Sequence, residues 1–418
     1  MGIQNHDSFI TFKKQYIRMK KIFLTAATAF FLLQSAFAQV APKKDTTGYQ
    51  NRKLKLEEVN LVSSYYSQDG NNAAVTGGIG TQKLTDIANI FDVKLSKYDS
   101  RLRKHNFGLE VGIDNYSSAS SDMIDLQANS SASHGDVRIY PSLSWSVENE
   151  KKGTTFALGA SSSSEYDYQS FGGNIAFSAK TKNRSGEFTA KFQTYLDQVS
   201  LILPIELRAN INGRDHDNNG SAARNTFAGS LSYSQIINER LQVMLLADVI
   251  QQNGYLSLPF HRVYFKDGSV HQEKLPNSRF KLPLGFRANY FLGDNLIIRT
   301  YYRYYTDNWG LKSSTAEIEV PVKINPFFSI SPFYRYYNQT AAKYFAPYQT
   351  HTISSEFYNS NYDLAKFSSN FYGAGIRFAP PKGVLGLQRL SMLELRYGHY
   401  SKSINMSSNI ISLNIKYK

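Results

Sequence analysis

The chain of 418 residues contains no cysteine. This absence excludes disulfide bonds, thiol catalysis, iron–sulfur clusters and cysteine-ligated zinc, and it also excludes a lipid-modified N-terminal cysteine. Long hydrophobic runs are missing as well. The mean hydropathy is −0.38, and no stretch approaches the ~18–20 consecutive apolar residues of a membrane-spanning helix.

Aromatic residues, by contrast, are abundant. The chain has 29 Tyr and 27 Phe, and aromatics make up 14% of its residues, well above the content of an ordinary soluble domain. A transmembrane β-barrel reconciles this content with the negative hydropathy, because its interior and loops are polar while its lipid-facing side and interfacial girdles are aromatic.

An alternation of apolar and polar residues is the most informative pattern. In residues 279–290 every even position is apolar or aromatic, whereas the odd positions include the cations Arg279, Lys281 and Arg287. Successive side chains of a strand point to opposite faces, so this segment has one apolar and one polar face. Soluble sandwiches use strands of about 5–6 residues, whereas ~9–11 residues are needed to cross a bilayer. The pattern therefore predicts an outer-membrane β-barrel.

We predict an all-β fold consisting of one antiparallel transmembrane β-barrel of about 16 strands, with 14 as the alternative. The predicted strands are 56–67, 88–98, 105–116, 135–148, 153–164, 169–180, 185–197, 224–236, 240–252, 279–292, 295–306, 311–323, 326–338, 367–378, 390–402 and 406–417.

The connections between these strands alternate in length. Long connections follow the first, third, seventh, ninth and thirteenth predicted strands. Single-chain barrels have short periplasmic turns and longer outside loops, and an even strand number brings both termini to the periplasm. The sequence therefore predicts periplasmic termini and long extracellular loops. The short turns are expected at 98–100, 149–151, 182–184, 238–239, 292–294 and 325–326.

The N-terminal region has the features of a secretory signal. Lys20 and Lys21 supply the charged part, residues 22–33 the apolar part, and a small-x-small motif predicts cleavage after Ala38. Residues 1–18 precede a second methionine and are expected to be an upstream extension from a mis-chosen start codon. The predicted organisation is an extension plus signal peptide in 1–38, a short periplasmic tail in 39–53 and the barrel in 54–418.

The polar faces of four neighbouring predicted strands carry many charges. Arginine and glutamate alternate across them, so the side chains can form a cross-strand ladder, in which each opposite-charge pair contributes ~0.2–1 kcal/mol. This ladder is either a charged constriction that selects solutes or a set of ion pairs that only stiffens the barrel wall facing a water-filled interior. Its mildly cationic balance predicts a weak preference for anions. The predicted pore-lining residues are Arg279, Lys281, Arg287, Arg299, Arg303, Glu317, Glu319 and Arg335.

One segment resembles a calcium-binding loop. Asp215, Asp217 and Asn219 alternate ahead of Gly220, and oxygen ligands at this spacing suit Ca²⁺. The twelfth position of the motif is Thr226, however, where a complete loop needs a bidentate glutamate. Aspartate, asparagine and glycine are also ordinary turn formers. The segment is therefore either a weak Ca²⁺ site or a plain extracellular loop, and no other cofactor is expected.

Other chemistries lack a supporting pattern. The glycine-rich run 76–81 has neither the Gly-Lys-Ser/Thr motif nor the following helix of a phosphate-binding loop, and a tightly folded loop is expected there. The 8 histidines are scattered without metal-ligand or catalytic spacing. The net charge of +14 is not gathered on a basic helix or an aromatic platform. We expect neither an enzyme nor a nucleic-acid-binding protein.

Several distinctive runs are spread along the chain: SYYSQDGN (64–71), VTGGIGT (75–81), YSSAS (116–120), EKLPNSR (273–279), YYRYYTDNWG (301–310) and YDL (362–364). They resemble one family of Gram-negative outer-membrane barrels, common in Bacteroidetes-type bacteria, that is catalogued only as a domain of unknown function. The resemblance implies an outer-membrane location and brings no activity, substrate or catalytic residue.

The sequence favours a porin-like channel or transport conduit for small polar solutes, with a weak preference for anions, because a sixteen-strand circumference leaves room for an aqueous channel. The alternative is a barrel that is plugged by its own loops and scaffolds a periplasmic or surface partner. Loops turned inward around 77–80 or 362–364 favour the alternative. The expected partners are outer-membrane lipid, small polar solutes and the barrel-assembly machinery, since the final strand ends on the aromatic Tyr417.

Overall fold

The computed structural model describes residues 53–118, 136–207 and 220–418. All of them belong to one compact unit, residues 52–418. No helix in this part of the chain is long and apolar enough to cross a membrane.

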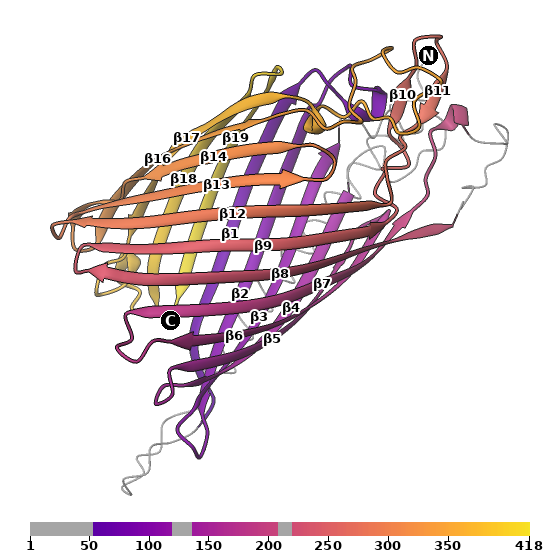
Figure 1. Ribbon diagram of the computed structural model, residues 1–418. Coiled ribbons are helices and arrows are strands. Elements are labelled where there is room, and N and C mark those ends of the chain that lie inside the picture. Colours follow the sequence, from indigo (N-terminus) through magenta and orange to yellow (C-terminus); the bar gives the residue numbers. More distant parts are fainter. Residues whose placement is uncertain (1–52, 119–135, 208–219) are drawn as a thin grey trace, which may run out of the picture. The chain divides into compact units, whose positions relative to one another are not determined.

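The unit is a closed antiparallel β-barrel (Figure 1). Consecutive strands are hydrogen-bonded neighbours, and β1 pairs with β19 to close the sheet. The sheet runs through β1 (Lys55–Gly70), β2 (Leu84–Tyr98), β3 (Lys104–Ser118), β4 (Asp136–Asn149), β5 (Thr154–Ser164), β6 (Tyr168–Lys180), β7 (Gly186–Ser200), β8 (Ser221–Asn238), β9 (Leu241–Gly254), β12 (Ser278–Leu292), β13 (Leu296–Asp307), β14 (Lys312–Glu319), β15 (Val322–Asn325), β16 (Phe328–Gln339), β17 (Phe367–Phe378), β18 (Leu390–Lys402) and β19 (Met406–Tyr417).

Two of these segments are halves of one crossing strand. Both β14 and β15 pair with β13 on one side and β16 on the other, so the described residues form sixteen crossing strands. Pro321 interrupts the crossing because proline has no backbone N–H to donate to the ladder. Its neighbour Val320 still donates to Pro332 O at 2.9 Å, and Pro321 O accepts from Ile297 N at 3.1 Å. The wall therefore continues through the break.

The predicted fold class is confirmed, with sixteen strands rather than fourteen. Several strands are longer than expected: β2 starts at Leu84 instead of residue 88, and β8 spans Ser221–Asn238 instead of 224–236. The prediction also missed a small hairpin in the connection after β9. It consists of β10 (Arg262–Tyr264) and β11 (Val270–Gln272), which form a separate two-stranded sheet. Short 3₁₀ helices lie in the connections: Ala74–Thr76, Ile205–Leu207, Tyr362–Leu364 and Val384–Gly386.

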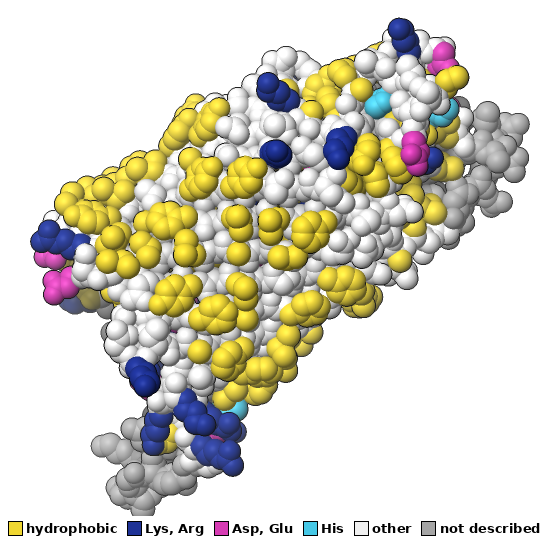
Figure 2. All heavy atoms as spheres, viewed as in Figure 1, with side chains coloured by type: hydrophobic (Ala, Val, Ile, Leu, Met, Phe, Trp, Pro, Cys, Tyr) yellow, Lys and Arg dark blue, Asp and Glu magenta, His cyan; other side chains and the backbone are white. Residues whose placement is uncertain are grey.

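The outer face of the barrel is apolar. On β12, Phe280 and Leu284 are 41% and 44% exposed, and on β13 the ring of Tyr302 is 47% exposed. Arg279 and Lys281, which flank Phe280, and Arg303, which follows Tyr302, are among the predicted inward cations. Figure 2 shows hydrophobic side chains spread over the visible wall, with charged side chains mostly toward its ends. An exposed apolar band of this kind is what a lipid-facing surface requires.

Three long connections pack against one another at one end of the barrel, where β10 and β11 lie in Figure 1. We call residues 71–83, 255–277 and 340–366 the loop assembly. Arg262 donates to Val75 O at 3.0 Å, which joins the first two connections. Gly77 has φ +77°, and a Cβ there would lie 2.5 Å from the Tyr264 ring, so this contact requires glycine. The two connections fit together at that point.

The third connection joins the same assembly. Lys274 and Tyr358 exchange backbone hydrogen bonds of 3.1 and 2.8 Å. Leu275, Trp309 and Ala342 form a small buried hydrophobic cluster, and Leu364 packs against it. The expectation of a tightly folded glycine-rich loop around 77–80 agrees with these contacts, and the loops have an apolar core of their own.

Candidate functional site

The eight predicted pore-lining residues lie on β12, β13, β14 and β16, at positions that alternate with the exposed apolar ones. Tyr334 and Ile318, for example, are 43% and 41% exposed on the outer face, and their sequence neighbours Arg335 and Glu317 point the other way. All eight residues therefore share the inner face of one continuous wall.

Two of the predicted ladder contacts are present. Arg335 and Glu317 are direct cross-strand partners, and Arg335 Nε donates to Glu317 Oε2 at 2.6 Å. Arg299 lies opposite Glu319 with Nη1 and Oε2 3.9 Å apart. Arg303 is different, because its partner across the strand pair is Thr315 and not a carboxylate. The ladder therefore pairs part of the predicted set and leaves Arg303 out.

A further arginine, Arg396, pairs with one of the ladder glutamates. Arg396 on β18 lies 3.2 Å from Glu319 Oε1 and 3.4 Å from Glu394 Oε1. Its guanidinium also lies over the Phe333 ring, with Cζ 5.2 Å from the centroid. Alternation alone places Arg396 on the inner face, but its contact with a strand that is not its neighbour has no sequence signal.

Arginines on β12 and β13 lie against tyrosine rings. Arg287 Cζ is 4.9 Å from the centroid of Tyr301, and Arg303 Cζ is 5.8 Å from that of Tyr305. Such cation–π contacts hold the guanidinium in place without neutralising its charge. Within the described residues neither arginine forms an ion pair.

The end of β13 nearest the loop assembly contains a buried ion pair. Arg279 Nε donates to Asp307 Oδ2 at 2.9 Å, and the Asp307 side chain is fully buried. Tyr305 OH donates to the same carboxylate at 2.8 Å, and Leu311 N donates to its other oxygen at 3.0 Å. Arg279 also lies over the Trp309 ring at 4.3 Å. Sequence reasoning missed Asp307, although it lies in the family-like run 301–310.

Lys281 lies beside this pair and is rich in cationic neighbours. Arg279, Arg224 and Arg303 are close enough to repel its ammonium group, and Asp307 is the acid that attracts it. Lys281 forms no ion pair within the described residues. The inner wall below the loop assembly therefore carries an excess of positive charge.

Arg224 connects the wall to the loop assembly. Its Nε and Nη2 donate to the carbonyl oxygens of Tyr255 and Ser257 at 2.9 and 3.1 Å. On the barrel side its guanidinium lies over the Tyr168 ring at 5.8 Å, and Tyr168 OH in turn donates to the carboxylate of Asp197. The connection after β9 is thereby attached to the inner wall.

A second charged group lies at the closure of the barrel. Lys94 Nζ lies 3.2 Å from Glu58 and 3.4 Å from Asp92, and Lys416 also pairs with Glu58. Asn60 donates to Asp92 at 3.1 Å. These residues belong to β1, β2 and β19, so polar pairs cross-link the inner side of the seam where the first and last strands meet.

The loop assembly has a buried polar centre at Glu273. One oxygen of its carboxylate accepts from Leu258 N at 3.0 Å, and the other lies 3.0 Å from His261 Nδ1 and 2.5 Å from Asn359 Nδ2. The side chains of His261 and Glu273 are 8% and 3% exposed. Burial, together with the nearby charge of Glu273, raises the pKa of Tyr255 to about 12. This centre fixes the loops to one another.

Two further features bear on ligand binding. The predicted Ca²⁺ ligands Asp215, Asp217 and Asn219 lie outside the described residues. Among the residues that the structure describes, no cluster of three or more acidic or histidine side chains could hold a metal ion.

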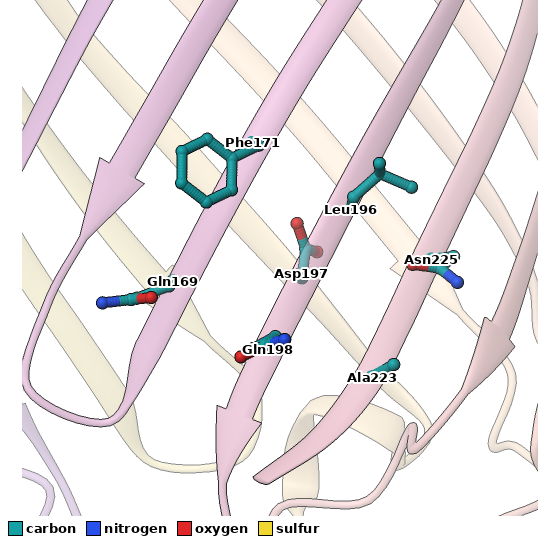
Figure 3. A pocket seen from close by; sticks show the side chains of 7 residues that line it. All are labelled: Gln169, Phe171, Leu196, Asp197, Gln198, Ala223 and Asn225. Atoms are coloured by element: carbon teal, nitrogen blue, oxygen red, sulfur yellow. The ribbon is translucent and has the colours of Figure 1, made fainter.

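A recess of about 400 Å³ lies across β6, β7 and β8. Phe171 and Leu196, which line it, are 64% and 50% exposed on the outer face, so it is not part of the inner wall. Figure 3 shows its lining residues, Gln169, Phe171, Leu196, Asp197, Gln198, Ala223 and Asn225.

Comparison with solved structures finds barrels of low sequence identity. Pseudomonas aeruginosa OccK9 (OpdG) has 10% identity and a TM-score of 0.43, with 87% of this chain and 98% of that chain covered. A BenF-like porin from Pseudomonas fluorescens has 9% identity and a TM-score of 0.41, with coverage of 86% and 98%. The ferric enterobactin receptor PfeA of Pseudomonas aeruginosa has 11% identity and a TM-score of 0.46, with coverage of 82% and 53%. At these scores the structures do not inform the function.

The sequence has no significant match among functionally curated proteins. A family profile, described as "Protein of unknown function (DUF3570)", matches residues 117–384. The predicted resemblance to an uncharacterised family is thus supported, although the match begins after the runs at 64–71 and 75–81. Because the profile covers more than half of the sequence, the chain belongs to the DUF3570 family of proteins of unknown function.

Proposed function

We propose that this chain is an outer-membrane conduit of the porin-like class, through which small polar solutes, preferentially anions, cross the outer membrane of a Gram-negative bacterium. The observation that carries the proposal is the inner wall of β12 and β13, where Arg287 and Arg303 have no carboxylate partner among the residues that the structure describes. A barrel of about sixteen strands leaves an aqueous channel where eight strands would be filled by side chains. Unpaired cations on such a wall favour the entry of anions.

The proposed orientation places the loop assembly outside and the short turns in the periplasm. The alternation of long and short connections supports this orientation. The signal peptide in 1–38 and the periplasmic tail in 39–53 belong to the same proposal. Folding by the barrel-assembly machinery is proposed from β19, the strand that closes the barrel on β1 and ends on the aromatic Tyr417.

A second candidate function is a barrel that its own loops occlude and that binds a partner. The observation that favours it is the loop assembly, in which Leu275 and Ala342 pack with Trp309 of the β13–β14 turn in a buried hydrophobic cluster and Glu273 forms a buried polar centre. Mobile loops at a channel mouth need neither feature. Under this alternative the assembly is a rigid plug or a display surface.

Single-channel recording in planar bilayers distinguishes the two candidates. The conduit predicts stepwise conductance by the full-length mature chain. The matched variant replaces the β10–β11 connection, residues 256–276, by a short Gly/Ser linker, and the conduit predicts a larger conductance with similar selectivity. Conductance that appears only after this replacement would support the occluded barrel. A wild-type barrel and a variant that both fail to conduct would contradict the conduit.

A further inference from the structure

We infer that Arg287 and Arg303 form a binding station for the carboxylate of an organic anion that also has an apolar body. This inference rests on the proposed conduit and names its substrate class. The two arginines occupy adjacent rungs of one strand pair: Arg303 lies opposite Gly285, and Arg287 lies opposite Tyr301.

The first argument is charge. Arg335, Arg299 and Arg396 on the same wall have Glu317 or Glu319 within 4 Å. Arg303 lies opposite Thr315 on its other side, and Arg287 lies opposite Met244. Neither has an ion-pair partner in the described part of the chain, so their charge is available to a solute.

The second argument is geometry. Tyr301 and Tyr305 lie under the two guanidinium groups at 4.9 and 5.8 Å. A guanidinium that stacks on a ring uses its flat face, and its in-plane N–H groups remain free to bind a carboxylate in a two-pronged manner. The rings also restrict arginine rotamers, which lowers the entropy lost when a ligand binds.

The third argument is the apolar strand beside the arginines. On β9 the inward residues Met244, Leu246 and Ile250 lie opposite Arg287, Gly285 and Lys281. The inward positions of β4 by contrast include three serines, Ser142, Ser144 and Ser146. A ligand held at the arginines therefore has apolar side chains on one flank, which an inorganic anion would not use but an alkyl or aryl group would.

The neighbouring charges extend the station along the wall. Lys281 lies toward the loop assembly and Arg299 toward the opposite end of the strand pair. Cations therefore recur along β12 and β13 every two residues or more, and two residues of a strand span ~7 Å. Asp248 is the inward acid on β9 between Leu246 and Ile250, and it forms no ion pair in the described residues. Its charge opposes anion binding at this point.

Isothermal titration calorimetry on the detergent-solubilised full-length barrel tests the inference without requiring conduction. The ligands are phenylacetate, acetate and phenylethylamine. The wild type should bind phenylacetate more tightly than acetate, and it should bind phenylethylamine least. The variant Arg287→Gln/Arg303→Gln should bind phenylacetate about tenfold more weakly or worse, because charge-assisted hydrogen bonds are lost. Asp248→Asn should bind it more tightly.

The control variant Arg138→Gln/Lys191→Gln removes the same charge from the inner faces of β4 and β7. Arg138 also lies over a ring, that of Tyr140, at 4.9 Å, but it donates to Ser163 at 2.8 Å. This variant should bind phenylacetate within about twofold of the wild type. Circular dichroism checks that each variant is folded, and single substitutions of Arg287 and Arg303 replace the double variant if it is not.

Equal loss of binding in the two double variants would overturn the inference, as would equal affinity for phenylacetate and acetate. A barrel that binds phenylacetate as predicted but never conducts would support the station and contradict the conduit. A barrel that conducts but binds phenylacetate equally well with and without the two arginines would support the conduit and contradict the station.

Discussion

Arg396 on β18 reaches Glu319 on β14 at 3.2 Å, although β16 and β17 lie between these strands in the sheet. Glu319 thus serves two arginines, since Arg299 approaches it from β13. The contact therefore joins two strands that are not neighbours across the curved inner wall, unlike the pairs between adjacent strands. It concentrates the neutralised charge on β14 to β18 and leaves β12 and β13 with the excess of cations.

The assignment of faces makes a prediction about stability in the membrane. Tyr302→Arg places a charge on the lipid-facing side in the middle of β13, where the tyrosine is 47% exposed, and should lower the free energy of unfolding by ~2–4 kcal/mol near the bilayer midplane. Arg299→Ala alters an inward residue of the same strand, whose side chain is 50% exposed in a loose pair, and should cost no more than ~1 kcal/mol. Denaturant unfolding in phospholipid vesicles measures both. Similar losses for the two variants would refute the assignment.

The buried pair at Asp307 should be far more important for stability than the exposed ladder pair. Asp307→Ala leaves Arg279 half-buried without its partner, and breaking a buried pair in this way costs ~3–5 kcal/mol. Glu317→Ala breaks a pair whose arginine is 46% exposed, and should cost ~0–1 kcal/mol. The same unfolding experiment compares them. A smaller loss for Asp307→Ala than for Glu317→Ala would contradict the interpretation.

Alkaline pH should loosen the loop assembly. Burial raises the pKa of Tyr255 to about 12 from the ordinary 10, so its neutral form is favoured when the loops are packed. The resulting stability is fully present below pH 10 and is lost as pH rises toward 12. The difference in phenolate absorbance between wild type and Tyr255→Phe should titrate near 12. A difference spectrum centred at 10 would mean that the ring is not held in a buried site.

The absence of cysteine makes the topology simple to test. Lys266→Cys lies in the exposed turn of the β10–β11 hairpin, and Asn238→Cys lies at the exposed end of β8, beside the turn to β9. In intact cells an impermeant maleimide should label only the first, and both should react after the outer membrane is permeabilised. Labelling of Asn238→Cys alone in intact cells would invert the proposed orientation.

The barrel was predictable from the sequence because the residues of its strands alternate between the apolar outer face and the polar inner face. In 279–290 the apolar and charged positions alternate without a break, and the strand found there, Ser278–Leu292, keeps that parity. Arg299, Glu319 and Arg335 followed from the same rule. Their placement depends only on strand parity and on which strands are neighbours in the chain.

Features that depend on curvature or on loops were not predictable in this way. The hairpin of β10 and β11 has strands of 3 residues each, too short for an alternation to be recognised, and packing against other loops stabilises it. The ion pair between Arg396 and Glu319 depends on the curvature of the wall, because it joins strands that are not neighbours. Asp307 lies at a strand end, where an aspartate is equally consistent with an ordinary turn.

The central claim is that the cationic wall of β12 and β13 sets an anion preference in a conducting barrel. Reversal potentials in planar bilayers under a potassium chloride gradient test it most directly, at dilute salt where the Debye length is ~30 Å at 0.01 M. The wild type should prefer chloride, and Arg299→Glu/Arg303→Glu should shift the reversal potential toward cation selectivity. A wild-type barrel with no anion preference, or a reversal potential unmoved by the double substitution, would contradict the account.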